Sequence, residues 1–121
     1  MILKFIRFIL GYTIVGLSAL FSPRRQRRTK TEQQAVDQAT QSLALYEFYL
    51  CPFCVRVRRM IRRLNLSIEY RDAKNNAEHR ERLLNEGGRI KVPCLRIEEA
   101  GKVTWMYESR DINDYLSQRF A

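Results

Sequence analysis

Apolar and polar positions follow one another in a regular order from residue 43 onward. Short apolar or alternating runs are typical of strands, and apolar residues three or four positions apart are typical of helices. The predicted elements are a strand over 43–50, a helix over 52–64, a strand over 66–71, a helix over 75–87, strands over 94–98 and 103–107, and a helix from 109. This β-α-β-α-β-β-α order predicts an α/β fold with a mixed four-stranded sheet that ends in an antiparallel hairpin.

The first 22 residues are apolar enough to predict a membrane anchor. The run from Ile2 to Ser22 is interrupted only by Lys4 and Arg7, and its 21 residues would form a helix about 31 Å long, close to the thickness of a bilayer core. Apolar residues occur on every side of this helix, which favours a spanning helix over one lying on the surface. A cleaved signal peptide and a core helix or disordered leader are the alternatives.

The charge distribution completes the predicted organisation. Residues 1–30 hold seven cations and no acid, and five of the seven follow the apolar run. The positive-inside rule then predicts a single-pass protein whose C-terminal domain faces the cytoplasm, with residues 1–30 in contact with membrane lipid. The predicted parts are an anchor over 1–22, a basic juxtamembrane segment and polar linker over 23–42, and one domain over 43–121. Residues 31–121 hold the other 15 cations and all 13 acids, so this part is nearly neutral. It also lacks nucleic-acid-binding motifs, which argues against a nucleic-acid partner.

The candidate chemistry lies between the first strand and the first helix, at Cys51-Pro52-Phe53-Cys54. A cysteine at this turn places its sulfur at a helix N-terminus, where unpaired N–H groups and the helix dipole favour the thiolate. The second sulfur lies one turn further on and can attack a mixed disulfide formed on the first. Pro52 occupies the first helical position, where its missing N–H costs nothing. We interpret this motif as a redox dithiol.

Two further motifs allow a resemblance to be stated. Lys91-Val92-Pro93-Cys94-Leu95 precedes the third strand, and Met106-Tyr107-Glu108-Ser109-Arg110-Asp111-Ile112 opens the last helix. With the dithiol and the element order, they make residues 43–121 resemble a glutaredoxin of the thioredoxin fold. Details are similar to the N-terminal domain of glutathione transferases. The resemblance implies a glutathione-dependent thiol–disulfide oxidoreductase in which Cys51 and Cys54 are catalytic. The predicted anchor would make this enzyme membrane-tethered. Its partners would be glutathione, the reductant, and disulfide-bonded or glutathionylated proteins.

The resemblance also implies a glutathione site. Pro93 would be cis and face the dithiol, so that Val92 exposes its backbone N–H and C=O to the cysteinyl part of glutathione. Glu108 and Ser109 would hold the γ-glutamyl group, since a helix N-terminus suits its carboxylate. Lys91 would pair with the glycine carboxylate.

Two residues depart from the glutaredoxin pattern. Phe53 is expected to contact glutathione, and it keeps the ring of the usual tyrosine but lacks the hydroxyl. Tyr49 stands where many glutaredoxins carry a lysine near the nucleophile. The loss of that lysine removes one cation that would favour the thiolate.

Several alternatives remain open at this stage. A glutaredoxin-like domain can hold a [2Fe–2S] cluster between two protomers through its first cysteine and glutathione. A glutathione transferase and a redox-inert tether are further possibilities. Cys94 and His79 would complete a zinc site with the dithiol, although a buried Cys94 and a solvated His79 fit the pattern better, and no metal is expected. The first helix also presents five arginines, either as a solvated face or as a docking surface for an acidic partner or the membrane: Arg56, Arg58, Arg59, Arg62 and Arg63.

Overall fold

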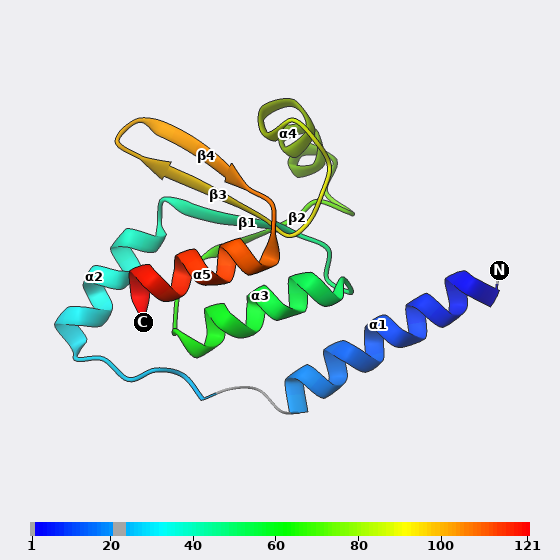
Figure 1. Ribbon diagram of the computed structural model, residues 1–121, viewed down its shortest axis with the longest axis horizontal. Coiled ribbons are helices and arrows are strands. Elements are labelled where there is room, and N and C mark those ends of the chain that lie inside the picture. Colours follow the sequence, from blue (N-terminus) through cyan, green and yellow to red (C-terminus); the bar gives the residue numbers. More distant parts are fainter. Residues whose placement is uncertain (1, 21–23) are drawn as a thin grey trace.

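The structure is a computed structural model that describes residues 2–20 and 24–121 (Figure 1). Its elements are α1 (Ile2–Leu20), α2 (Lys30–Thr40), β1 (Leu43–Glu47), α3 (Pro52–Arg63), β2 (Glu69–Asp72), α4 (Ala77–Gly87), β3 (Cys94–Glu99), β4 (Lys102–Met106) and α5 (Ser109–Phe120). The order from β1 onward is the predicted one. β1 is shorter than predicted, because residues 49 and 50 form a turn instead of extending the strand.

The strands form one mixed sheet in the order β2-β1-β3-β4, which confirms the predicted four-stranded arrangement. β1 is parallel to β2 and antiparallel to β3, and Leu45 lies opposite Tyr70 on one side and Leu95 on the other. β3 and β4 are antiparallel and are joined by a turn in which Ala100 and Gly101 both have positive φ angles, 51° and 76°.

Helices cover both faces of the sheet, with α3 and α5 on one face and α4 on the other (Figure 1). Successive strand residues point to opposite faces, so Leu45 joins the core under α3 and α5 while Tyr46 joins the core under α4. Both residues are completely buried. A central strand covered on both faces explains why β1 reads as a continuous apolar run instead of an alternating one.

The predicted linker contains a helix that belongs to the body of the protein. Thr29 caps α2 by accepting a hydrogen bond from the backbone N–H of Glu32. Val36 and Ala39 pack against the core formed with α3 and α5. The sequence predicted a polar linker here, and the structure shows a helix whose apolar side is used for packing.

The predicted membrane anchor over 1–22 is wrong, and so is the single-pass, cytoplasm-facing arrangement that was built on it. Across residues 2–20 and 24–121, no helix combines the length and apolar content needed to cross a bilayer. α1 carries Lys4 and Arg7 in its first turns and contains glycines, threonine and serine further along, which dilute its apolar character. The lipid contact predicted for residues 1–30 loses its basis with the anchor. The predicted end of the anchor, at 21–23, lies outside the described residues.

α1 instead packs on the loop that precedes α3. Gly11 is buried, and a Cβ atom at this position would lie 2.9 Å from Leu50 Cβ. The missing side chain therefore allows the helix backbone to approach the residue that precedes Cys51. An apolar groove of about 390 Å³ lies between α1 and this loop, with Leu50 and Pro52 on its loop side.

The two glycines of α1 test this packing as a matched pair. Gly16 has no atom within 4 Å of an added Cβ. Gly16→Ala should therefore raise the free energy of unfolding by about 0.5–1 kcal/mol through helix propensity alone. Gly11→Ala should lower it by about 1–2 kcal/mol, because the new methyl group pushes α1 away from Leu50. Urea unfolding followed by circular dichroism measures both, and equal stabilisation in the two variants would contradict the packing.

Candidate active site

The dithiol lies at the N-terminus of α3, as predicted. Cys51 is the N-cap residue, with φ −73° and ψ 123°, and its carbonyl accepts a hydrogen bond of 3.0 Å from the Val55 N–H. Pro52 is the first residue of the helix. Cys51 is half-buried and Cys54 is fully buried, and neither is in a disulfide. The outer sulfur is thus accessible to a reactant while the inner one is covered.

The surroundings of Cys51 lower its pKa to about 6. The largest cause is a hydrogen bond from the Cys54 thiol, followed by hydrogen bonds from the backbone N–H groups of Cys54 and Phe53 and by the charge of Arg58, while burial opposes them. The pKa of Cys54 is raised far above its usual value, first by this hydrogen bond to Cys51 and then by burial. At neutral pH the pair therefore holds one proton, on Cys54.

An ion pair with Glu47 holds Arg58, the cation whose charge helps to lower the pKa of Cys51. Arg58 donates a hydrogen bond of 2.6 Å to Glu47 Oε2 and another of 2.7 Å to the Tyr49 carbonyl. Burial raises the pKa of Glu47, and the hydrogen bond and charge of Arg58 oppose that shift. The sequence analysis treated Arg58 as one of five similar arginines on the helix and missed its ion pair with Glu47. The signal that was available is Glu47, an acid at the end of a buried strand that needs a nearby cation.

The second predicted motif also has the predicted backbone. The Val92–Pro93 peptide bond is cis, Pro93 is buried and Val92 is half-buried. In the turns and loops of the described chain, neither the N–H nor the C=O of Val92 takes part in a backbone hydrogen bond. Figure 1 shows that this loop, the start of α3 and the start of α5 lie toward the same end of the sheet.

The structure pairs two residues that the sequence assigned to opposite ends of glutathione. Lys91 Nζ donates a hydrogen bond of 2.7 Å to Glu108 Oε1, and both side chains are exposed. The hydrogen bond to Lys91 and then its charge lower the pKa of Glu108. Glu108 is the N-cap of α5 but makes no side-chain capping bond, and the next residue, Ser109, is buried. The ion pair therefore lies beside a helix N-terminus whose side-chain cap is missing.

Of the remaining residues that the sequence analysis singled out, two lie on the surface near the dithiol and two lie on the α4 side of the sheet. Phe53 and Tyr49 are 59% and 58% exposed, so both residues lie on the surface around the dithiol. Cys94 is fully buried on the α4 side of the sheet, and burial raises its pKa to about 12. His79, on α4, contacts the Tyr46 ring edge-on, with 6.1 Å between the ring centroids. In the described part of the chain, no group of histidine, cysteine and acidic residues is arranged to hold a metal ion.

Comparison with known proteins agrees with this geometry. Residues 45–121 match the glutathione S-transferase N-terminal domain. The maleylacetoacetate isomerase from Anaeromyxobacter dehalogenans 2CP-1, solved with GSH bound in its active site, is similar at 26% identity with a TM-score of 0.52, over 65% of this chain and 38% of that one. The same isomerase solved with dicarboxyethyl glutathione and citrate gives 26% identity and a TM-score of 0.52, over 65% and 37%.

Glutathione transferase Omega 3C from Trametes versicolor is similar in fold, at 23% identity and a TM-score of 0.51, over 78% of this chain and 42% of that one. The search of curated proteins finds no match. The chain spans less than half the length of the solved structures that it matches. The family match covers more than half of this chain, and it includes the sheet, the dithiol and α5. The chain therefore belongs to the glutathione S-transferase N-terminal domain family.

Proposed function

We propose that this protein is a glutathione-dependent thiol–disulfide oxidoreductase that reduces protein disulfides or glutathione mixed disulfides. The observation that carries the proposal is the Cys51 sulfur, whose pKa is lowered to about 6 at the N-terminus of α3. A cysteine is a nucleophile in its thiolate form, and an accessible thiolate is what attacks a disulfide.

In the first step the Cys51 thiolate attacks the glutathione sulfur of a mixed disulfide. The old S–S bond breaks, a new one joins Cys51 to glutathione, and the substrate cysteine leaves as a thiolate that takes a proton from water. A second glutathione thiolate then attacks the glutathione sulfur on Cys51. Oxidised glutathione leaves and Cys51 is again a thiolate. The cycle therefore consumes one free glutathione, and the glutathione of the substrate becomes the other half of the oxidised product.

Cys54 provides the route for protein disulfides. The main cause of its raised pKa is the hydrogen bond that it donates to the Cys51 thiolate. Once the Cys51 sulfur is in a mixed disulfide, that thiolate no longer exists and Cys54 loses its proton more readily. The Cys54 thiolate then attacks the Cys51 sulfur and releases the reduced substrate. Two glutathione molecules reduce the resulting Cys51–Cys54 disulfide.

The residues beside the dithiol fit the chemistry of glutathione. Glutathione carries two carboxylates and one ammonium, and the Lys91–Glu108 pair offers one charge of each sign. The N-terminus of α5, with Ser109 as its first residue, suits a carboxylate. The backbone of Val92 offers a free donor and acceptor for a peptide, next to Pro93. The exposed ring of Phe53 would cover the apolar part of the bound tripeptide.

Serine substitutions separate the roles of the two cysteines. Cys51→Ser should abolish glutathione-dependent reduction of a mixed disulfide, because the nucleophile is lost. Cys54→Ser should retain part of this reaction, since a second glutathione can replace the resolving thiol. A coupled assay of oxidised glutathione measures both variants. Equal and complete loss in the two would contradict the route through glutathione.

The pH dependence of alkylation tests the cause of the low pKa. The Cys51 thiolate fraction should rise with pH through a midpoint near 6, so iodoacetamide should alkylate this residue slowly below pH 6 and fast above it. Cys54→Ala should move the midpoint toward the ordinary value of about 8.5, because the largest stabilising hydrogen bond is removed. Arg58→Gln should move it less, and the exposed Arg56→Gln serves as its control. A midpoint that stays in place in Cys54→Ala would show that another interaction holds the charge.

Glu108 tests the glutathione site. Glu108→Gln should raise KM for glutathione by about tenfold while kcat changes little. The substitution removes the negative charge that would bind the ammonium of glutathione and that also holds Lys91 in place. Glu78→Gln, in the first turn of α4, removes the same charge from another helix N-terminus and should leave KM unchanged. A drop in kcat without a change in KM would argue against a binding role for Glu108.

A further inference from the structure

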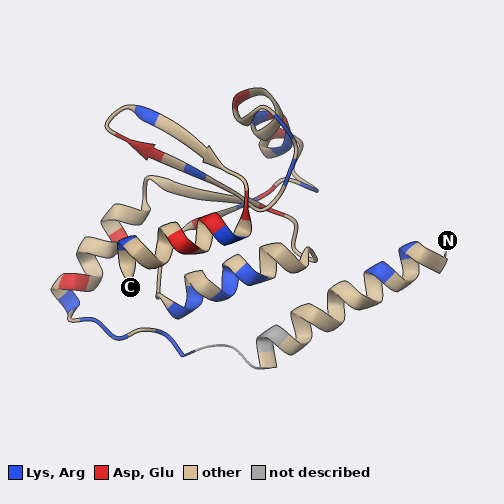
Figure 2. Ribbon diagram, viewed as in Figure 1, with Lys and Arg blue, Asp and Glu red and all other residues tan. Residues whose placement is uncertain are grey.

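A strongly basic surface lies at the C-terminal end of α3. Residues 24–28 and 52–63 together hold nine arginines and no acidic residue. Figure 2 shows these basic stretches in α3 and in the segment that leads into α2. The Gln26 N–H donates a hydrogen bond of 2.9 Å to the Arg63 carbonyl, so the segment is held against the end of the helix. Two stretches that are far apart in sequence therefore add their charges at one place.

Some of these arginines stabilise the fold. Arg28 donates hydrogen bonds of 2.6 Å to the carbonyls of Leu64 and Phe120, which lie at the C-terminal ends of α3 and α5. Arg58 pairs with Glu47. Both guanidinium groups satisfy buried or terminal acceptors, so their positions follow from the packing of the domain.

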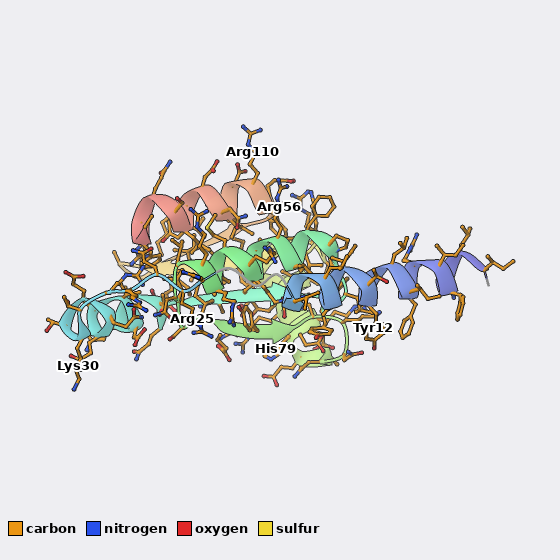
Figure 3. The ribbon with its side chains drawn as sticks, turned by 90° about the horizontal axis from the view of Figure 1, so that it is seen from below. Tyr12, Arg25, Lys30, Arg56, His79 and Arg110 are labelled. Carbon is orange, nitrogen blue, oxygen red and sulfur yellow. The ribbon has the colours of Figure 1, made fainter. Side chains whose placement is uncertain are left out.

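Five other arginines are exposed and have no carboxylate partner. We call them the arginine cluster: Arg24, Arg25, Arg27, Arg62 and Arg63. Within the described residues, no ion pair includes any of the five. Arg25 donates to Asn65 Oδ1 at 3.2 Å, a neutral acceptor that leaves its charge uncompensated. Arg25 belongs to the segment that leads into α2, and Arg56 lies in the first half of α3, nearer to Cys51 than the cluster is (Figure 3).

We propose that the arginine cluster docks an acidic segment of the protein whose disulfide or mixed disulfide Cys51 reduces. This inference rests on the proposed function. The cluster and the nucleophile belong to the same helix, since Cys51 caps α3 and Arg62 and Arg63 end it. A concentrated patch of one sign raises the local concentration of an oppositely charged substrate and speeds its association.

The length of α3 sets the spacing that the substrate must have. The 11 residues from Cys51 to Arg62 correspond to about 16 Å along the helix axis. An extended peptide covers about 3.3 Å per residue. Acidic residues about five positions away from the substrate cysteine would therefore reach the cluster while the cysteine meets Cys51.

An acidic protein segment fits this surface better than a nucleic acid does. A nucleic acid carries no disulfide for the thiol beside the patch. Binding of single strands also uses aromatic side chains on which bases stack. Residues 24–28 and 52–63 contain one aromatic residue, Phe53, and it lies at the dithiol end of the helix.

Three glutathionylated peptides test the proposal with the full-length protein. The first has a cluster of glutamates about five residues from its single cysteine, the second has glutamines there, and in the third the glutamates directly follow the cysteine. The first peptide should show a kcat/KM about tenfold higher than the second at low ionic strength. Its advantage should shrink to less than about twofold in 0.5 M salt, because screening shortens the reach of the charges. The third peptide should gain less than the first, since its charges lie short of the cluster.

A matched pair of variants assigns the effect to the cluster. Arg62→Gln/Arg63→Gln should lose most of the preference for the acidic peptide and keep normal activity on the glutamine peptide, which also shows that it is folded. Arg80→Gln/Arg82→Gln removes two exposed arginines from α4 and should keep the full preference.

The outcomes separate this inference from the proposed function. If no peptide is deglutathionylated, the proposed function fails. If all three react at one rate, or if the preference survives in Arg62→Gln/Arg63→Gln, the function stands and the docking surface is wrong. A short DNA duplex that binds more tightly than the acidic peptide, and loses affinity in the same variant, would overturn the proposal and assign the surface to nucleic acid.

Discussion

The chemistry proposed for this protein depends on one negative charge held on the Cys51 sulfur. The charge is held by the Cys54 thiol and by two backbone N–H groups at the start of α3, which together outweigh the cost of partial burial. This arrangement requires the chain to leave β1 at the turn over residues 49–50 and to enter the helix at Pro52. The Glu47–Arg58 pair links the end of the strand to the helix and keeps a cation near the sulfur. The start of α3 carries the thiolate and its buried side builds the core, while its outer end carries the arginine cluster.

The features that the sequence predicted well have local causes. The dithiol was recognisable because a strand-like run, a Cys-x-x-Cys motif and a helical stripe follow one another without a gap. The end of α4 was predictable because only glycine easily adopts the positive φ of 100° found at Gly88. The cis bond before Pro93 came from the resemblance to glutaredoxins, since no local pattern distinguishes it. The mixed sheet followed from the alternation of strands and helices along the chain.

The features that the sequence missed depend on contacts between distant residues. α1 covers most of the predicted anchor, but its packing on the loop at Leu50 depends on the close approach of Gly11 to that loop, which no local pattern in the sequence shows. Arg58 looks like its neighbours in α3 until Glu47 is seen beneath it. Lys91 and Glu108 are 17 residues apart, and their ion pair follows from the way β4 returns the chain to the start of α5. The joining of segment 24–28 to the end of α3 is likewise a property of the fold.

The most direct test of the account is to locate the first adduct that oxidised glutathione forms with the reduced protein. Mass spectrometry of the Cys54→Ser variant after brief exposure near neutral pH should find glutathione on Cys51, with Cys94 unmodified because it is buried and protonated. That result would place the reactive thiolate at the N-terminus of α3. Modification of Cys94 ahead of Cys51, or of neither residue at glutathione concentrations that modify a free cysteine peptide, would contradict the account.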